Sequence, residues 1–245
     1  MSEKFNMEGY SEFLKLALQS GYKFLAFHEK DGHPDSKFCL LRHDIDADLN
    51  AALQMAKAEH ALGIRSTYFL MLRSPVYNIF GRANNDYVQQ IISLGHEIGL
   101  HYDEGYYPEK NKDLNELVEK EARIMFLAFG KEIKVVSFHQ PGEQVLNNTI
   151  RLNNFLNTYD KKQFEGIFYI SDSNMVWKNE TPWQLFSKAS YPKVQLLIHP
   201  MWWVGAGNEN TFELWDKALL DNSKRSFEQI IKTERAFGKE RFLKF

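Results

Sequence analysis

FCLLRHDID, residues 38–46, is the stretch that decides the fold. Its first four residues are apolar, and a run this short is typical of a strand buried on both faces. The run ends at two aspartates, Asp44 and Asp46, which are expected to point the same way because side chains alternate along a strand. Burying two carboxylates is costly unless a metal ion or a shared proton compensates them. A simpler interpretation makes one of them the N-cap of a following helix.

Similar apolar runs recur along the chain and alternate with helical patterns. Seven strands are predicted, at 22–27, 38–43, 66–72, 97–101, 133–138, 166–170 and 194–198. Helices are expected at 8–20, 49–62, 85–94, 113–129 and from Thr211 onward, with a loop at 28–36 and a mixture of short helix and loop at 145–163. This alternation predicts an α/β fold, a distorted (β/α) barrel with about seven parallel strands, in one domain over residues 1–245.

The bulk composition argues against several classes of protein. A net charge of -2 provides no general attraction for nucleic acid or an anionic membrane. Cys39 is the only cysteine, so neither an internal disulfide nor a thiolate metal cluster is possible. No stretch approaches the roughly 20 apolar residues of a membrane span, and the N-terminal residues lack an apolar signal core. We therefore expect a cytoplasmic protein that binds neither nucleic acid nor membrane, with its oligomeric state left open.

Chemically capable side chains follow five of the predicted strands. They are Asp44 and Asp46, His101, His139, Asp172 and His199. Because the carboxyl ends of parallel strands meet at one edge of the sheet, we expect these side chains to share a site. Carboxylate and neutral imidazole suit Zn²⁺ and related divalent ions, and such an ion makes water a nucleophile near neutral pH. A spare carboxylate then suits a general base and a histidine a general acid. His96 lies five residues before His101, faces the opposite side and is expected to be structural.

Five motifs over roughly residues 38–203 resemble, in order, those of the polysaccharide deacetylase superfamily: HDID, GHEIGLH, SFHQPG, SDS and LLIHP. These are the NodB-homology enzymes of carbohydrate esterase family 4. The nearest likeness is to an outlying branch found with bacterial surface-polysaccharide biosynthesis. The resemblance implies a NodB-type distorted barrel and metal-dependent removal of acetyl from an N-acetylated sugar. It implies Asp44 as general base, Asp46 and His101 as metal ligands, His199 as general acid, and Asp172 as the residue that assists His199.

The chain departs from the family pattern at two places. The family usually has a second metal histidine four residues after the first, but this chain has Gly105 there. The third motif usually contains an arginine, whereas this chain has SFHQP at 137–141. We expect His139 to supply the missing ligand to one divalent ion, with Zn²⁺ the expected ion. Asp103 is the alternative third ligand.

Several aromatic residues lie beside the predicted site. Trp202 and Trp203 closely follow His199, and Tyr102 directly follows His101. They are candidate substrate-binding residues, because an aromatic face can stack on a sugar ring; the alternative is that they cover the end of the barrel. Tyr106 and Tyr107 pose the same choice.

Three functions are compatible with these residues. The first is a metal-dependent hydrolase that removes an acyl (acetyl) group from an N-acylated amino sugar or polysaccharide precursor. The second is the same reaction on a non-sugar amide, with a small-molecule substrate. The third is a barrel without turnover that binds carbohydrate or a partner protein. A glycosidase with paired carboxylates would not need three convergent histidines.

Overall fold

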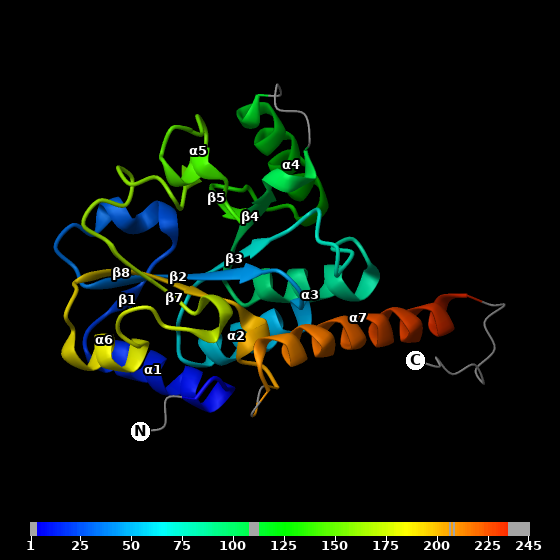
Figure 1. Cartoon of the computed structure of the whole chain (residues 1–245), viewed down its shortest axis with the longest axis horizontal. Helices are drawn as coiled ribbons and strands as arrows, with labels where there is room; N and C mark the ends of the chain where they lie inside the picture. Colours follow the sequence, from blue (N-terminus) through cyan, green and yellow to red (C-terminus); the bar gives the residue numbers. More distant parts are fainter. Residues whose placement is uncertain (1–3, 108–112, 206, 208, 235–245) are drawn as a thin grey trace.

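The computed structural model describes residues 4–107, 113–205, 207 and 209–234. Its centre is a sheet in which seven parallel strands run in the order β6-β5-β4-β3-β2-β8-β7. Their bounds are β2 Phe38–Ile45, β3 Thr67–Leu70, β4 Glu97–Asp103, β5 Val135–His139, β6 Leu156–Asn157, β7 Phe168–Ser171 and β8 Lys193–Ile198. An eighth strand, β1 (Lys23–Phe24), pairs with the start of β2. The sheet curls into a half-barrel flanked by helices, so the predicted distorted α/β barrel with about seven parallel strands is confirmed (Figure 1).

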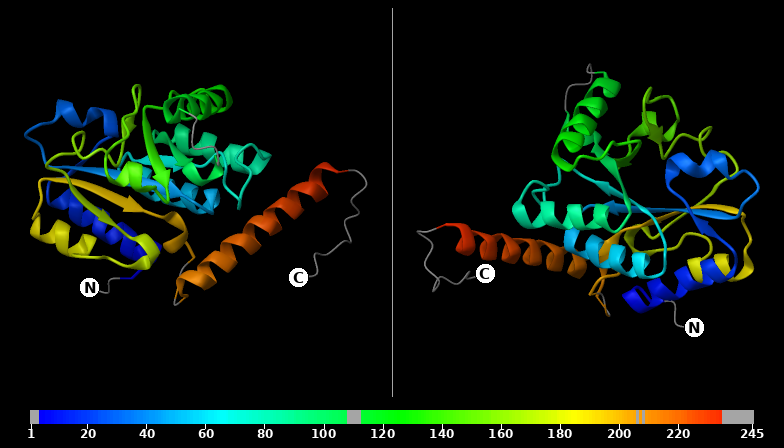
Figure 2. Two further views of the ribbon diagram at one scale, coloured as in Figure 1. Left: turned by 45° about the horizontal axis from the view of Figure 1, so that its top comes forward. Right: turned by 180° about the vertical axis from the view of Figure 1, so that it is seen from behind.

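The helices of the described chain flank this sheet. They are α1 Met7–Gln19, α2 Leu49–Ala61, α3 Arg82–Ser93, α4 Leu114–Phe129, α5 Glu143–Leu146, α6 Pro182–Lys188 and α7 Thr211–Thr233. Short 3₁₀ helices form at η1 Phe27–Gly32, η2 Glu104–Tyr106, η3 Ser173–Met175 and η4 Pro200–Trp202. One apolar cluster includes side chains of α2, α3 and α4, and another includes those of α1 and α6, which lie side by side (Figure 2). No helix among the described residues combines the length and apolarity needed to cross a membrane.

Strand β2 positions the functional end of the molecule. It is buried over its whole length, as predicted for a strand covered on both faces. Cys39 and Leu41 pack in the cluster with α1 and α6, whereas Phe38 and Leu40 pack on the other face, inside the curl of the sheet. This alternation continues into the charged residues that follow, because the period of a strand is two. The even-numbered side chains at the end of β2 therefore enter the inside of the curl.

Some predicted elements differ in extent. Helix α3 begins at Arg82, three residues before the predicted start. The sequence did not indicate this start because the residue before it, Gly81, has no side chain that could cap the helix. The region predicted as loop at 28–36 contains most of η1, and the strand predicted at 22–27 is reduced to β1. The mixed region at 145–163 contains the end of α5 and also strand β6. Two residues are too few to show a strand period, which is why β6 was missed.

Candidate active site

The carboxyl ends of β2, β4, β5 and β8 bring five predicted residues together. Asp46 Oδ1 lies 3.1 Å from Nε2 of His101 and 3.4 Å from Nδ1 of His139. Asp46 Oδ2 lies 3.9 Å from Nε2 of His199, and Asp44 Oδ2 lies 3.7 Å from Nδ1 of His101. The predicted convergence of these residues at one end of the sheet is confirmed.

Three of these side chains form a candidate metal centre. Asp46, His101 and His139 each offer one ligand atom, and the three atoms lie within 4.8 Å of one another. Ligands of a tetrahedral zinc ion lie about 2.1 Å from it and so roughly 3.4 Å apart, which fits the spacings around Asp46. Asp46 Oδ1 is buried and has no hydrogen-bond partner of good geometry among the described residues. A cation relieves such an arrangement, so the residues present fit a divalent ion.

The alternative third ligand has a different role. Asp103 Oδ1 accepts a hydrogen bond of 2.9 Å from the backbone N–H of Gly105 and so caps η2. The cluster found in the described residues contains His139 and not Asp103. The structure therefore favours His139 over Asp103 as the side chain that would complete the ligand set.

The charges of the cluster support one another. Burial alone would raise the pKa of Asp46, but the imidazoles of His101 and His139 outweigh it and hold this pKa below its ordinary value. The Asp46 carboxylate, 3.4 Å from Nδ1 of His139, in turn raises the pKa of His139, although burial opposes this. To bind a metal ion, Asp46 must be ionised and the ligating nitrogens of His101 and His139 must carry no proton, so the ion competes with protons for these nitrogens. Metal binding is therefore expected to strengthen as the pH rises through the titration of His139.

Asp44 is held by an arginine from its own strand. Nε and Nη2 of Arg42 donate to the two carboxylate oxygens of Asp44 at 2.8 Å and 2.7 Å. The side chains are 0% and 3% exposed. Burial would raise the pKa of Asp44, but Arg42 outweighs it and the net pKa is lowered. Asp44 is therefore a fixed, ionised carboxylate beside the candidate metal centre.

Sequence reasoning did not identify Arg42 as part of the site. The third motif of this chain lacks the arginine usual in the polysaccharide deacetylases that it resembles, yet the structure has a guanidinium beside Asp44 from β2 itself. Nη1 of Arg42 also donates to Thr158 Oγ1 at 3.0 Å, and its guanidinium packs over the rings of Phe69 and Tyr159. The signal was present, since Arg42 lies two residues before Asp44 and so on the same face of the strand.

Ser137 is a second residue that the sequence did not reveal. Its hydroxyl lies 2.7 Å from Nδ1 of His101 and donates to Asp44 Oδ1 at 3.5 Å. When Nδ1–H of His101 donates to this hydroxyl, Nε2 keeps its lone pair toward Asp46, which is the tautomer a metal ligand needs. Ser137 thereby connects a candidate metal ligand to Asp44. Its position two residues before His139 on β5 was the available signal.

His199 and Asp172 form a hydrogen-bonded pair on the other side of the cluster. Nδ1 of His199 lies 2.6 Å from Asp172 Oδ1, and Asp172 also accepts the backbone N–H of His199 and Nε1–H of Trp203. Burial would lower the pKa of His199, but the Asp172 carboxylate outweighs it and raises this pKa to about 9. His199 therefore holds a proton at neutral pH, and its Nε2 faces Asp46 at 3.9 Å. This arrangement suits a proton donor.

The predicted sugar-stacking role of three aromatic residues is not supported. Tyr102, Trp202 and Trp203 are 1%, 3% and 0% exposed, so none presents a ring face to a substrate. Trp203 packs against Phe5, Tyr10 and Phe13 instead. These residues belong to the core, which corresponds to the alternative that they cover the end of the barrel.

Two further interpretations are settled by position. The side chain of Asp48, not of Asp44 or Asp46, caps α2 by accepting the backbone N–H groups of Asn50 and Ala51. His96 is buried away from the site, where Nε2 contacts the backbone carbonyl of Ala56 at 3.0 Å, as expected of a structural residue.

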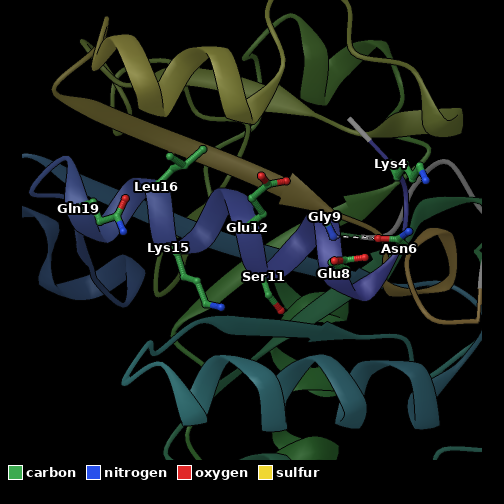
Figure 3. Close-up of a pocket in the computed structure, with 9 residues that line it drawn as sticks. All are labelled: Lys4, Asn6, Glu8, Gly9, Ser11, Glu12, Lys15, Leu16 and Gln19. Carbon is green, nitrogen blue, oxygen red and sulfur yellow. Dashed lines mark hydrogen bonds between the residues drawn. The ribbon is translucent and has the colours of Figure 1, made fainter. Parts of the chain in front are cut away.

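A hollow of about 780 Å³ on the surface is separate from this site. It runs along α1 and is lined by Lys4, Asn6, Glu8, Gly9, Ser11, Glu12, Lys15, Leu16 and Gln19 (Figure 3). None of the residues predicted for the site contributes to it. The hollow is therefore no part of the candidate active site.

Comparisons with known proteins found similarity of fold only. No family model and no curated protein matches the sequence. A CE4 family pseudoenzyme from Bacillus anthracis is similar in structure, with 14% identity, a TM-score of 0.45, and coverage of 79% of this chain and 63% of that one. A CE4 esterase from Streptococcus mutans gives 16% identity, a TM-score of 0.46, and coverage of 85% and 89%. This chain spans less than two thirds of the pseudoenzyme, and similarity at this level assigns no activity.

Proposed function

We propose that this chain is a metal-dependent hydrolase that removes an acyl group, most simply acetyl, from an N-acylated amino sugar or polysaccharide precursor. One observation supports this above all: the Asp46, His101 and His139 cluster lies beside the Asp44 carboxylate, which is paired with Arg42, and the His199 imidazole, which is paired with Asp172. Amide hydrolysis needs a base for the attacking water and an acid for the departing amine. The sugar part of the proposal rests on the resemblance of the motifs.

Each side chain has a distinct part in the proposed reaction. Asp46, His101 and His139 would hold a divalent ion, which supplies Lewis acidity and lowers the pKa of water. A carboxylate oxygen of Asp44 accepts the proton of the attacking water while Arg42 keeps that carboxylate in place.

The acid half of the reaction belongs to the second pair. As the new C–O bond forms and the C–N bond breaks, Nε2 of His199 gives its proton to the leaving nitrogen. Asp172 keeps Nδ1 protonated and holds the ring in orientation, so the imidazole can return to its charged form. The products are a carboxylic acid and a free amine.

The alternatives differ in how well the structure supports them. Hydrolysis of a non-sugar amide uses the same residues, so it remains the second candidate. The binding-only barrel relied on Trp202 and Trp203 as a surface for a glycan, and both are buried. Trp202 and Trp203 therefore give that alternative no support, although Tyr106, which is 49% exposed, still offers an aromatic ring.

The test is release of acetate by protein purified without chelator and supplied with one equivalent of Zn²⁺. N-Acetylglucosamine oligomers and a panel of non-sugar acetamides would be compared, with Asp44→Asn as the matched variant. We expect acetate from the amino sugars and a loss of about 10²–10⁴-fold in the variant, as for other general bases. Acetate from the acetamides alone would support the second candidate. Release from neither panel by metal-loaded protein would contradict the proposed reaction.

A further inference from the structure

Helix α7 leaves the body of the protein and extends beyond the sheet (Figure 1, Figure 2). Only Leu214, Ala218 and Asn222 are buried among its 23 residues. Nδ2 of Asn222 donates to a backbone carbonyl beside β2, and Arg225 pairs with Asp48 at 3.0 Å. The helix is thus attached along one face, and much of the rest of its surface is open among the described residues.

A second face of α7 exposes large apolar side chains, called here the α7 stripe. Phe212, Leu219, Leu220 and Ile230 are 80%, 46%, 53% and 38% exposed. Spacings of seven and eleven residues place Phe212, Leu219 and Ile230 in one line along a helix, with Leu220 beside Leu219. Large exposed apolar side chains gathered on one face of a helix are typical of an interaction site.

We propose that the α7 stripe binds the α7 stripe of a second copy of this chain in antiparallel orientation. Residues 211–222 contain three acidic side chains and one basic side chain. In residues 223–233, Arg225 is already paired with Asp48, and the remaining charges are two basic side chains, Lys224 and Lys232, and one acidic, Glu228. Antiparallel pairing places the acidic half of each helix beside the basic half of the other, and it also aligns the helix dipoles favourably. Parallel pairing would place like charges together. The surface is therefore complementary to itself, as a two-fold interface must be.

The size of this surface predicts a reversible dimer. A helix of this length spans about 35 Å. Contact along one helix face lies near the lower limit of roughly 1,000 Å² for a specific interface. We therefore expect monomer and dimer to exchange with concentration. This inference is independent of the proposed reaction, since α7 contributes no residue to the cluster around Asp46.

The first test is sedimentation velocity of the full chain over a range of concentrations. The wild type is expected to change from monomer to dimer, and Leu219→Glu with Leu220→Glu to remain monomeric at every concentration. Leu127→Glu is the matched control, because Leu127 is 69% exposed on α4 and lies outside the stripe. Far-ultraviolet circular dichroism would show that each variant is folded. A wild type that remains monomeric, or a dimer that survives the double substitution, would overturn the proposal.

A second test examines the charge pattern and the orientation. Asp216→Lys should weaken the dimer, and adding Lys224→Asp should restore it. In a Cys39→Ser background, a short bismaleimide should cross-link Ser223→Cys, near the middle of the stripe, but not Thr233→Cys at its end. Cross-linking at both positions would show parallel pairing and overturn the orientation. Strong protection of the stripe from hydrogen exchange in a monomer would show that the chain covers it itself, which also overturns the proposal.

Discussion

Replacing Arg42 by leucine is expected to lower the free energy of unfolding by about 3–5 kcal/mol, the usual cost of removing one partner of a buried ion pair. We expect a cost at the upper end of this range, because the two side chains are 0% and 3% exposed and are joined by two hydrogen bonds. The variant leaves the Asp44 carboxylate buried without its guanidinium. Arg42→Leu with Asp44→Asn should recover part of the loss, because no uncompensated buried charge is left.

The assay is urea unfolding of metal-free protein at several pH values. In the wild type the pKa of Asp44 is lowered, so its pairing stabilises the fold above the unfolded pKa of about 3.9 and is lost as the pH falls through the folded pKa. In Arg42→Leu, burial dominates and the folded pKa of Asp44 is raised. The penalty should therefore shrink as Asp44 takes up a proton, so the two proteins should converge as the pH falls from 7 to 4.

Arg65→Leu is the matched control for this experiment. Arg65 pairs with Glu29 at the surface, where the side chains are 40% and 31% exposed. An exposed pair typically contributes about 1 kcal/mol or less. The reasoning would be refuted if Arg42→Leu cost no more than Arg65→Leu, or if the penalty were the same at pH 4 as at pH 7.

Two further predictions concern the residues around the candidate metal centre. Ser137→Ala should weaken Zn²⁺ binding by about 10–100-fold, measured by competition with a chromophoric chelator, because the hydroxyl 2.7 Å from Nδ1 of His101 fixes its tautomer; equal affinity would exclude this role. In metal-free protein, the His199 imidazole should titrate near its raised pKa of about 9 by NMR, with the proton lost above that pH. Asp172→Asn should move that titration to lower pH, because it removes the carboxylate that favours the charged ring; an unmoved titration would contradict the pairing.

Alternation along strands explains why much of the site was predictable. Asp44 and Asp46 are two residues apart at the end of an apolar run, and the period of a strand places both on the inner face of the sheet. His101, His139 and His199 likewise follow apolar runs, so parallel strands bring them to the same end. These inferences need only local sequence and the common direction of the strands.

The remaining features depend on contacts between distant segments. A tryptophan after a strand has the same local pattern whether it faces a substrate or the core, and the burial of Trp203 depends on α1, nearly two hundred residues earlier in the chain. Arg42 follows the strand period, but no local rule shows that a buried arginine pairs with its neighbour at i+2. Strand β6 exists only through its pairing with Val135 and Val136.

The most direct test of the central claim is to measure the binding of Zn²⁺ to purified protein by isothermal titration calorimetry. The account predicts one ion per chain, with His139→Ala weakening binding as much as His101→Ala, because each supplies one ligand atom to the same cluster. His96→Ala is a matched control, since this buried histidine lies outside the cluster. Failure of the wild type to bind an ion, or binding unchanged by His139→Ala, would contradict the assignment of this metal centre.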